Sequence, residues 1–130
     1  MPEPERMIAA IKDHCRTLSR HDKEAWLRLW ADDAVLEDPV GVDIYRGLEA
    51  LGGEFWKLIK ALSPMKLWLS KKVIVCGYEA IGLLDGVVTQ DGKLRRVGPI
   101  VDHFTFREDG KIGMMRAFWN YGDYSRDNLK

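Results

Sequence analysis

The sequence of 130 residues has no excess of charge of either sign, since 20 Lys and Arg residues balance 20 Asp and Glu residues. This balance argues against a nucleic-acid-binding protein, which needs a basic face to neutralise phosphates. No apolar run approaches the roughly 18 residues that a membrane-spanning helix needs. The charged, proline-rich start (residues 1–6) is unlike a secretory signal. We therefore expect a cytoplasmic protein with neither a nucleic-acid nor a membrane partner.

Cysteine is scarce as well, and the two present, Cys15 and Cys76, match no metal-binding spacing. In apolar surroundings they are expected to act as small buried hydrophobic residues. The three histidines are scattered, so no metal site is predicted. The sequence also lacks a glycine-rich phosphate loop and a G-x-S-x-G nucleophile motif. These absences exclude the common patterns of nucleotide, metal and serine-hydrolase sites.

Aromatic residues are plentiful, with five Trp, four Tyr and four Phe, and the length fits one domain over residues 1–130. Apolar periodicity predicts helices over 4–20, 22–31 and 48–62, and strands over 34–38, 66–76, 78–89, 94–106 and 112–120. Two Asp-Gly pairs, at 91–92 and 109–110, predict two-residue hairpins. Helices followed by a strand meander indicate an α+β fold. We expect the helices to cover one face of a curved antiparallel sheet and to enclose an apolar pocket.

The strand predicted over 94–106 contains the main chemical anomaly. Strict alternation places Asp102 on the same face as Ile100, Phe104 and Phe106, which should point inward. Burial among apolar side chains disfavours the charged form of a carboxyl group, and a neutral carboxylic acid can donate a hydrogen bond. A bulge that turns Asp102 outward and an ordinary buried ion pair are the alternatives.

Two further residues are candidates for chemistry. Asp38 ends a predicted strand, where a carboxylate over a pocket can serve as a base, although Asp-Pro-x-Gly is also a common turn. His14 lies on the apolar stripe of the first predicted helix, either as a catalytic residue or as an ordinary core histidine.

Three segments together resemble the bacterial ketosteroid isomerases, which belong to the NTF2-like or SnoaL-like superfamily. These are Trp30–Gly41, which contains Glu-Asp-Pro-Val-Gly, then Pro99–Phe104, which contains Asp-His-Phe, and Met115–Trp119. The resemblance covers nearly the whole chain in the same order. It implies an NTF2-like cone, with the helices packed on the concave face of the sheet.

The resemblance also implies roles for residues. Asp38 would be the base that moves a proton between two carbons of a steroid or similar cyclic ketone, through a dienolate. Asp102 would be the neutral acid that donates to the dienolate oxygen; this family is itself the standard example of a carboxylic acid kept neutral at pH 7. The substrate would be apolar and steroid-like, with no cofactor or metal, and the chain would form a homodimer through the outer sheet face, which would carry Trp68, Val73 or Val75, and His103. The expected walls of the substrate site are Val40, Phe55, Trp56, Phe104, Phe118 and Trp119.

This sequence departs from the family at two places. His14 stands where the isomerases have the tyrosine that is their principal oxyanion donor, and Trp56 stands where they have a supporting tyrosine. His14 is therefore predicted to be the second donor, and Tyr45, Tyr121 or Tyr124 is an alternative. Losing one such donor costs about 10²–10³-fold in rate.

Two other functions remain open. In one, Asp102, Arg116 and Asp38 form the Asp-Arg-Asp arrangement of a limonene-epoxide-hydrolase-like enzyme, or the chain acts as a polyketide-cyclase-like member of the superfamily. In the other, the chain is a non-catalytic binder of hydrophobic small molecules.

Overall fold

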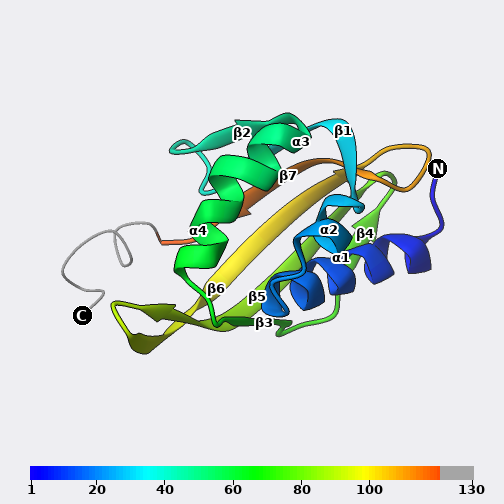
Figure 1. Cartoon of the computed structure of the whole chain (residues 1–130). Coiled ribbons are helices and arrows are strands. Elements are labelled where there is room, and N and C mark those ends of the chain that lie inside the picture. Colours follow the sequence, from blue (N-terminus) through cyan, green and yellow to red (C-terminus); the bar gives the residue numbers. More distant parts are fainter. Residues whose placement is uncertain (121–130) are drawn as a thin grey trace.

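A computed structural model describes residues 1–120 of the chain. In Figure 1 the helices lie together on one side of a strongly curved sheet whose longest strands are β5 and β6. The helical segments are α1 (Pro4–Ser19), α2 (Lys23–Leu27), α3 (Gly47–Ala50), a π-helical turn η1 (Leu51–Phe55) and α4 (Trp56–Ala61). The strands are β1 (Trp30–Glu37), β2 (Ile44–Arg46), β3 (Lys66–Leu69), β4 (Ile74–Cys76), β5 (Glu79–Gln90), β6 (Lys93–Phe106) and β7 (Ile112–Phe118). The predicted α+β architecture is confirmed.

The strand order is β2-β1-β7-β6-β5-β3, with β4 also paired to β5. The strand pairs of the described residues are antiparallel, as predicted, except that β1 runs parallel to β7, with Leu36 opposite Met115. Parallel neighbours need a long connection, and here it is most of the chain. This pairing brings the end of β1 beside the end of β7.

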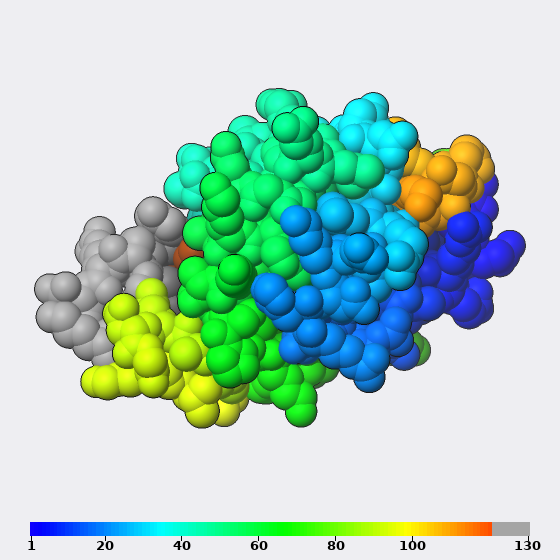
Figure 2. All heavy atoms as spheres, in the orientation of Figure 1, coloured from blue at the N-terminus to red at the C-terminus, as the bar shows by residue number. Residues whose placement is uncertain are grey.

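The first helix follows from its apolar stripe and from a proline in its first turn, and its buried side chains face the sheet. Gly82 on β5 lets the helix come close, because a Cβ atom there would lie 3.3 Å from Ile11 Cγ2. In Figure 2 the side chains of α1 and α2 (blue) meet those of the later helices (green), so that together they cover this face of the sheet.

The second predicted helix, 22–31, is too long at its C-terminal end. The side chain of Asp22 caps α2 by accepting a hydrogen bond from the backbone N–H of Ala25, but the helix ends at Leu27. Trp30 already belongs to β1 and pairs with Ile112 of β7. Pairing with a distant strand outweighs the helical pattern of this segment.

The third predicted helix is present but contains the π turn η1 at Gly52-Gly53. The strand predicted over 66–76 is divided into β3 and β4. Both pair with β5, but residues 70–73 loop out because four residues stand opposite only two of β5. The exposed Lys71 and Lys72 occupy this loop.

The hairpin at Asp91-Gly92 is confirmed: both residues have positive φ and join Gln90 directly to Lys93. The turn at Asp109-Gly110 is instead part of a five-residue loop between β6 and β7. None of the helices within residues 1–120 has the length and apolar character required to cross a bilayer.

Candidate active site

A cavity of about 250 Å³ lies between the helices and the concave face of the sheet. The three residues predicted to carry chemistry, His14, Asp38 and Asp102, all line it. Most of the other lining side chains are apolar: Leu18, Phe55, Ile59, Leu62, Met65, Leu67, Leu84, Val88, Val97, Ile100, Met115, Ala117 and Trp119, with Gln90 as a further polar residue. A cavity with few polar groups at fixed places is typical of a small-molecule site.

Asp102 points inward from β6, as the alternation of that strand predicts. It lies in register with Gly82 of β5 and Ala117 of β7, and only 3% of its surface is exposed. One carboxyl oxygen, Oδ2, is 3.4 Å from His14 Nε2. The other, Oδ1, is buried and has no hydrogen-bond partner among the described residues. A buried polar atom without a partner is costly, and a ligand in the cavity can supply the missing partner.

His14 reaches the same site from α1. Its Nδ1 accepts a hydrogen bond of 3.0 Å from Trp26 Nε1, and its Nε2 faces Asp102. The imidazole packs nearly perpendicular to the Phe104 ring, at 81°, with 5.5 Å between the ring centroids. The histidine is therefore a core residue and also part of the cavity wall.

Asp38 directly follows β1 and is the first residue of an Asp-Pro-x-Gly turn, which fixes its position. Its backbone N–H donates to the Asp43 carbonyl, and Gly41 supplies the positive φ (81°) of the Asp-Pro-x-Gly turn. Asp38 therefore both begins this turn and lines the cavity. Trp119 Nε1 donates a hydrogen bond of 2.7 Å to Asp38 Oδ1.

The environment of Asp38 suits a base that acts near neutral pH. Burial raises the pKa of Asp38 from 3.8 to about 6, and the hydrogen bond from Trp119 opposes this rise. A general base is most effective when its pKa lies near the working pH.

The same shift predicts how Asp38→Asn changes stability. Because the pKa of Asp38 is higher in the folded chain, ionisation destabilises the fold as pH rises from about 4 through about 6. From 3.8 to about 6, at 1.36 kcal/mol per pKa unit, the cost reaches about 3 kcal/mol. Urea unfolding should therefore show Asp38→Asn to be more stable than the unsubstituted chain by about 3 kcal/mol at pH 8 and nearly equal at pH 4. An equal difference at both pH values would contradict the raised pKa.

Four of the six expected wall residues do not line the cavity. Phe118 is 40% exposed, because alternation on β7 turns Met115 and Ala117 inward and Phe118 outward. Phe104 is fully buried behind His14. The remaining two are Trp56, which packs on Trp26, and Val40, whose backbone donates to the Ala117 carbonyl. Phe55 and Trp119 do line the cavity.

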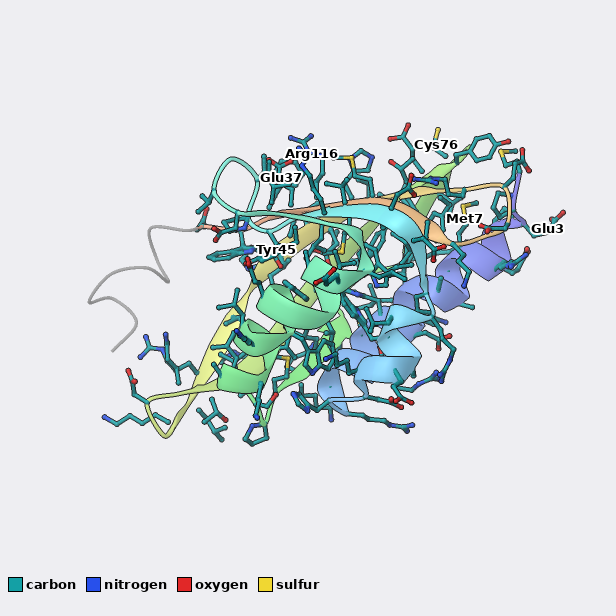
Figure 3. The ribbon with its side chains drawn as sticks, turned by 45° about the horizontal axis from the view of Figure 1, so that its top comes forward. Glu3, Met7, Glu37, Tyr45, Cys76 and Arg116 are labelled. Atoms are coloured by element: carbon teal, nitrogen blue, oxygen red, sulfur yellow. The ribbon has the colours of Figure 1, made fainter. Side chains whose placement is uncertain are left out.

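Arg116 does not approach the cavity either. Its Nε donates to Glu37 Oε1 at 2.9 Å, and its guanidinium carbon lies 5.4 Å from the centre of the Phe118 ring. Figure 3 shows Arg116 and Glu37 together on the side of the sheet away from the helices. Asp102, Arg116 and Asp38 therefore do not form an Asp-Arg-Asp arrangement.

Of the alternative tyrosine donors, Tyr45 packs against Phe55 and does not line the cavity. Tyr121 and Tyr124 lie outside the described residues.

Most of the apolar wall and two polar contacts, Trp119 to Asp38 and Trp26 to His14, are not among the predictions from sequence. Leu84, Val88 and Gln90 share one face of β5, so the period-two pattern of that strand contained the signal. The bond from Trp26 to His14 had no comparable signal, because a helical pattern does not show which indole N–H reaches a given side chain.

Comparisons with known proteins identify the family of the chain. The SnoaL-like domain family matches residues 11–113. A steroid Delta-isomerase from Nocardioides simplex is 35% identical over 115 residues, which is 88% of this chain and 90% of the relative. The chain therefore belongs to the SnoaL-like family, whose fold is NTF2-like.

Solved structures extend the comparison. The Mycobacterium tuberculosis protein RV0760c, determined in complex with estradiol-17beta-hemisuccinate, is 28% identical, with a TM-score of 0.79, covering 90% of this chain and 95% of that protein. The epoxide hydrolase/cyclase-like enzyme SalBIII, described for pyran ring formation in the polyether salinomycin, has a TM-score of 0.83 at 23% identity, covering 95% of this chain and 97% of SalBIII. The second likeness is one of fold alone.

Proposed function

We propose that this protein is an isomerase that shifts a double bond in a steroid or similar cyclic ketone by intramolecular proton transfer. The observation that carries the proposal is that a raised-pKa carboxyl group, Asp38, lines the same apolar cavity as Asp102 and His14. The steroid isomerase relative and the steroid bound to RV0760c support this substrate class.

In the proposed reaction, Asp38 removes the proton on the carbon between the ketone and the double bond, which leaves a dienolate. The negative charge gathers on the ketone oxygen, where Asp102 in its protonated form and the Nε2–H of His14 donate hydrogen bonds. Asp38 then returns the proton to the far end of the dienolate, so no atom is gained or lost. The apolar wall keeps water from the intermediate between the two transfers.

The direct test is to incubate the purified protein with a β,γ-unsaturated ketosteroid and follow the absorbance of the conjugated enone. An enone signal above the uncatalysed rate supports the proposal. No signal, together with saturable binding of an apolar steroid, would favour the alternative of a non-catalytic binder.

The pH dependence of this reaction is a separate prediction. Only ionised Asp38 can accept the proton, so kcat/KM should rise with pH up to about 6 and level off above it. In Trp119→Phe the rise should move to higher pH, because the hydrogen bond that lowers the pKa of Asp38 is lost. A profile that stays flat between pH 5 and 7 would contradict Asp38 as the base.

We also propose that the chain forms a homodimer through the outer face of the sheet. This face carries half-buried side chains such as Trp68 and Val101, and His103 is paired there with Glu79. Val73 does not belong to it, because its side chain is 8% exposed and packs in the core. Sedimentation at the mass of the single chain, 14.9 kDa, would contradict the dimer.

A further inference from the structure

Trp26 is a buried residue next to the candidate site, and its hydrogen bond to His14 takes no direct part in the proposed proton transfer. It lies on α2, has no exposed surface and does not line the cavity. Its indole stacks on Phe55 and packs against Trp30 and Trp56, with 5.0–5.3 Å between ring centroids. This packing fixes the direction in which its N–H points, which is toward His14 Nδ1.

An indole N–H can only donate a hydrogen bond, so the nitrogen that receives it must offer a lone pair. His14 Nδ1 is therefore unprotonated in this arrangement, and the ring proton is on Nε2. Nε2 is the nitrogen that faces Asp102, at 3.4 Å from Oδ2. We propose that Trp26 is a positioning residue that holds His14 as the Nε2–H tautomer, so that the imidazole presents a donor to the cavity.

Trp30 shows that an indole can pack beside His14 without donating a hydrogen bond to it. It is as buried as Trp26, at 1% exposure, and its ring lies as far from the imidazole, at 6.3 Å between centroids. Its Nε1, however, has no hydrogen-bond partner among the described residues. The two tryptophans thus differ in the N–H contact, which makes Trp30 a matched control.

The role of this tautomer rests on the proposed function. The opposite tautomer would present the Nε2 lone pair to the ketone oxygen, and two lone pairs repel as negative charge develops there. A doubly protonated His14 would have no acceptor for Trp26 and would leave the indole N–H buried without a partner. Trp26 therefore excludes the forms of His14 that do not suit a neutral donor.

The test that needs no substrate is nitrogen NMR of the uniformly ¹⁵N-labelled protein. The His14 signals are assigned by comparison with His21→Gln and His103→Gln, which remove the other two histidines. We expect Nε2 to carry the proton, Nδ1 to be unprotonated, and a coupling across the hydrogen bond to join Trp26 Nε1 to His14 Nδ1. A protonated Nδ1, or no such coupling, would overturn the proposal even if no variant could be made.

Replacing a tryptophan by phenylalanine removes the indole N–H but keeps an aromatic ring, so it tests the hydrogen bond separately from the packing. In Trp26→Phe we expect His14 Nδ1 to become partly protonated, whereas in Trp30→Phe the His14 spectrum should match that of the unsubstituted chain. An unchanged His14 spectrum in Trp26→Phe would overturn the proposal.

Activity is a second readout if the protein isomerises ketosteroids. Trp26→Phe should then lower kcat by about 10²-fold with KM nearly unchanged, because only the transition state uses the donor. Trp30→Phe should stay within about threefold. If the protein shows no isomerase activity, the proposed function fails while the NMR result still decides the tautomer.

Discussion

In Asp38→Asn, kcat for ketosteroid isomerisation is expected to fall by about 10²–10⁴-fold, the range that a general base contributes. Asparagine has nearly the same shape as aspartate, and its oxygen can still accept the hydrogen bond from Trp119. The amide cannot take up a proton at neutral pH, so the substrate binds but the carbon acid stays intact. Stopped assays with an excess of enzyme give kcat, and fluorescence titration with a phenolic steroid gives the affinity.

The loop that holds Asp38 offers a matched control in Asp43, an exposed carboxylate whose backbone carbonyl accepts from the Asp38 N–H. Asp43→Asn removes one negative charge near Asp38 but no proposed catalytic group, so its kcat should stay within about threefold. If Asp38→Asn kept more than about a tenth of the activity, another group would have to be the base. A loss of steroid affinity equal to the loss of kcat would instead indicate a damaged cavity.

A site residue could be predicted from the sequence where the alternation of a strand decides whether its side chain points toward the cavity. Asp102 is one member of an alternating run on β6 whose neighbours Phe104 and Phe106 are apolar, so its burial followed from period two alone. The same rule applied to β7 would have excluded Phe118 from the cavity. Its aromatic character suggests a wall residue, but alternation with the buried Ala117 turns Phe118 outward.

Contacts that join distant parts of the chain could not be predicted in this way. The bond from Trp119 to Asp38 spans 81 residues and depends on the parallel pairing of β1 with β7. Nothing in the local pattern of β1 specifies that partner, and for the same reason the apolar period predicts helix at the start of the strand. The bond from Trp26 to His14 spans only 12 residues, yet it depends on how α2 packs across α1. In both cases tertiary packing selects one indole N–H among several.

Asp102→Leu is the second substitution with a large expected effect. Leucine keeps the cavity wall apolar but removes the donor opposite the ketone oxygen, so kcat should fall by about 10²–10³-fold. Asp102→Asn retains an N–H donor of similar reach, so its loss should be smaller than that of the leucine variant. Initial rates at saturating ketosteroid, compared among the three proteins, measure the difference.

Stability and a neighbouring residue provide the controls for this prediction. Asp102→Asn keeps an oxygen that can face the His14 Nε2–H, so this substitution should not lower the free energy of unfolding by more than about 1 kcal/mol. His103, the next residue on β6, faces the opposite side of the sheet, so His103→Gln should keep kcat within about threefold. If Asp102→Asn lost as much activity as Asp102→Leu, the charge of the carboxylate would matter more than a donated hydrogen bond. That outcome would also remove the reason to pair Asp102 with a neutral Nε2–H donor on His14, because a carboxylate would hold that proton and keep it from the substrate.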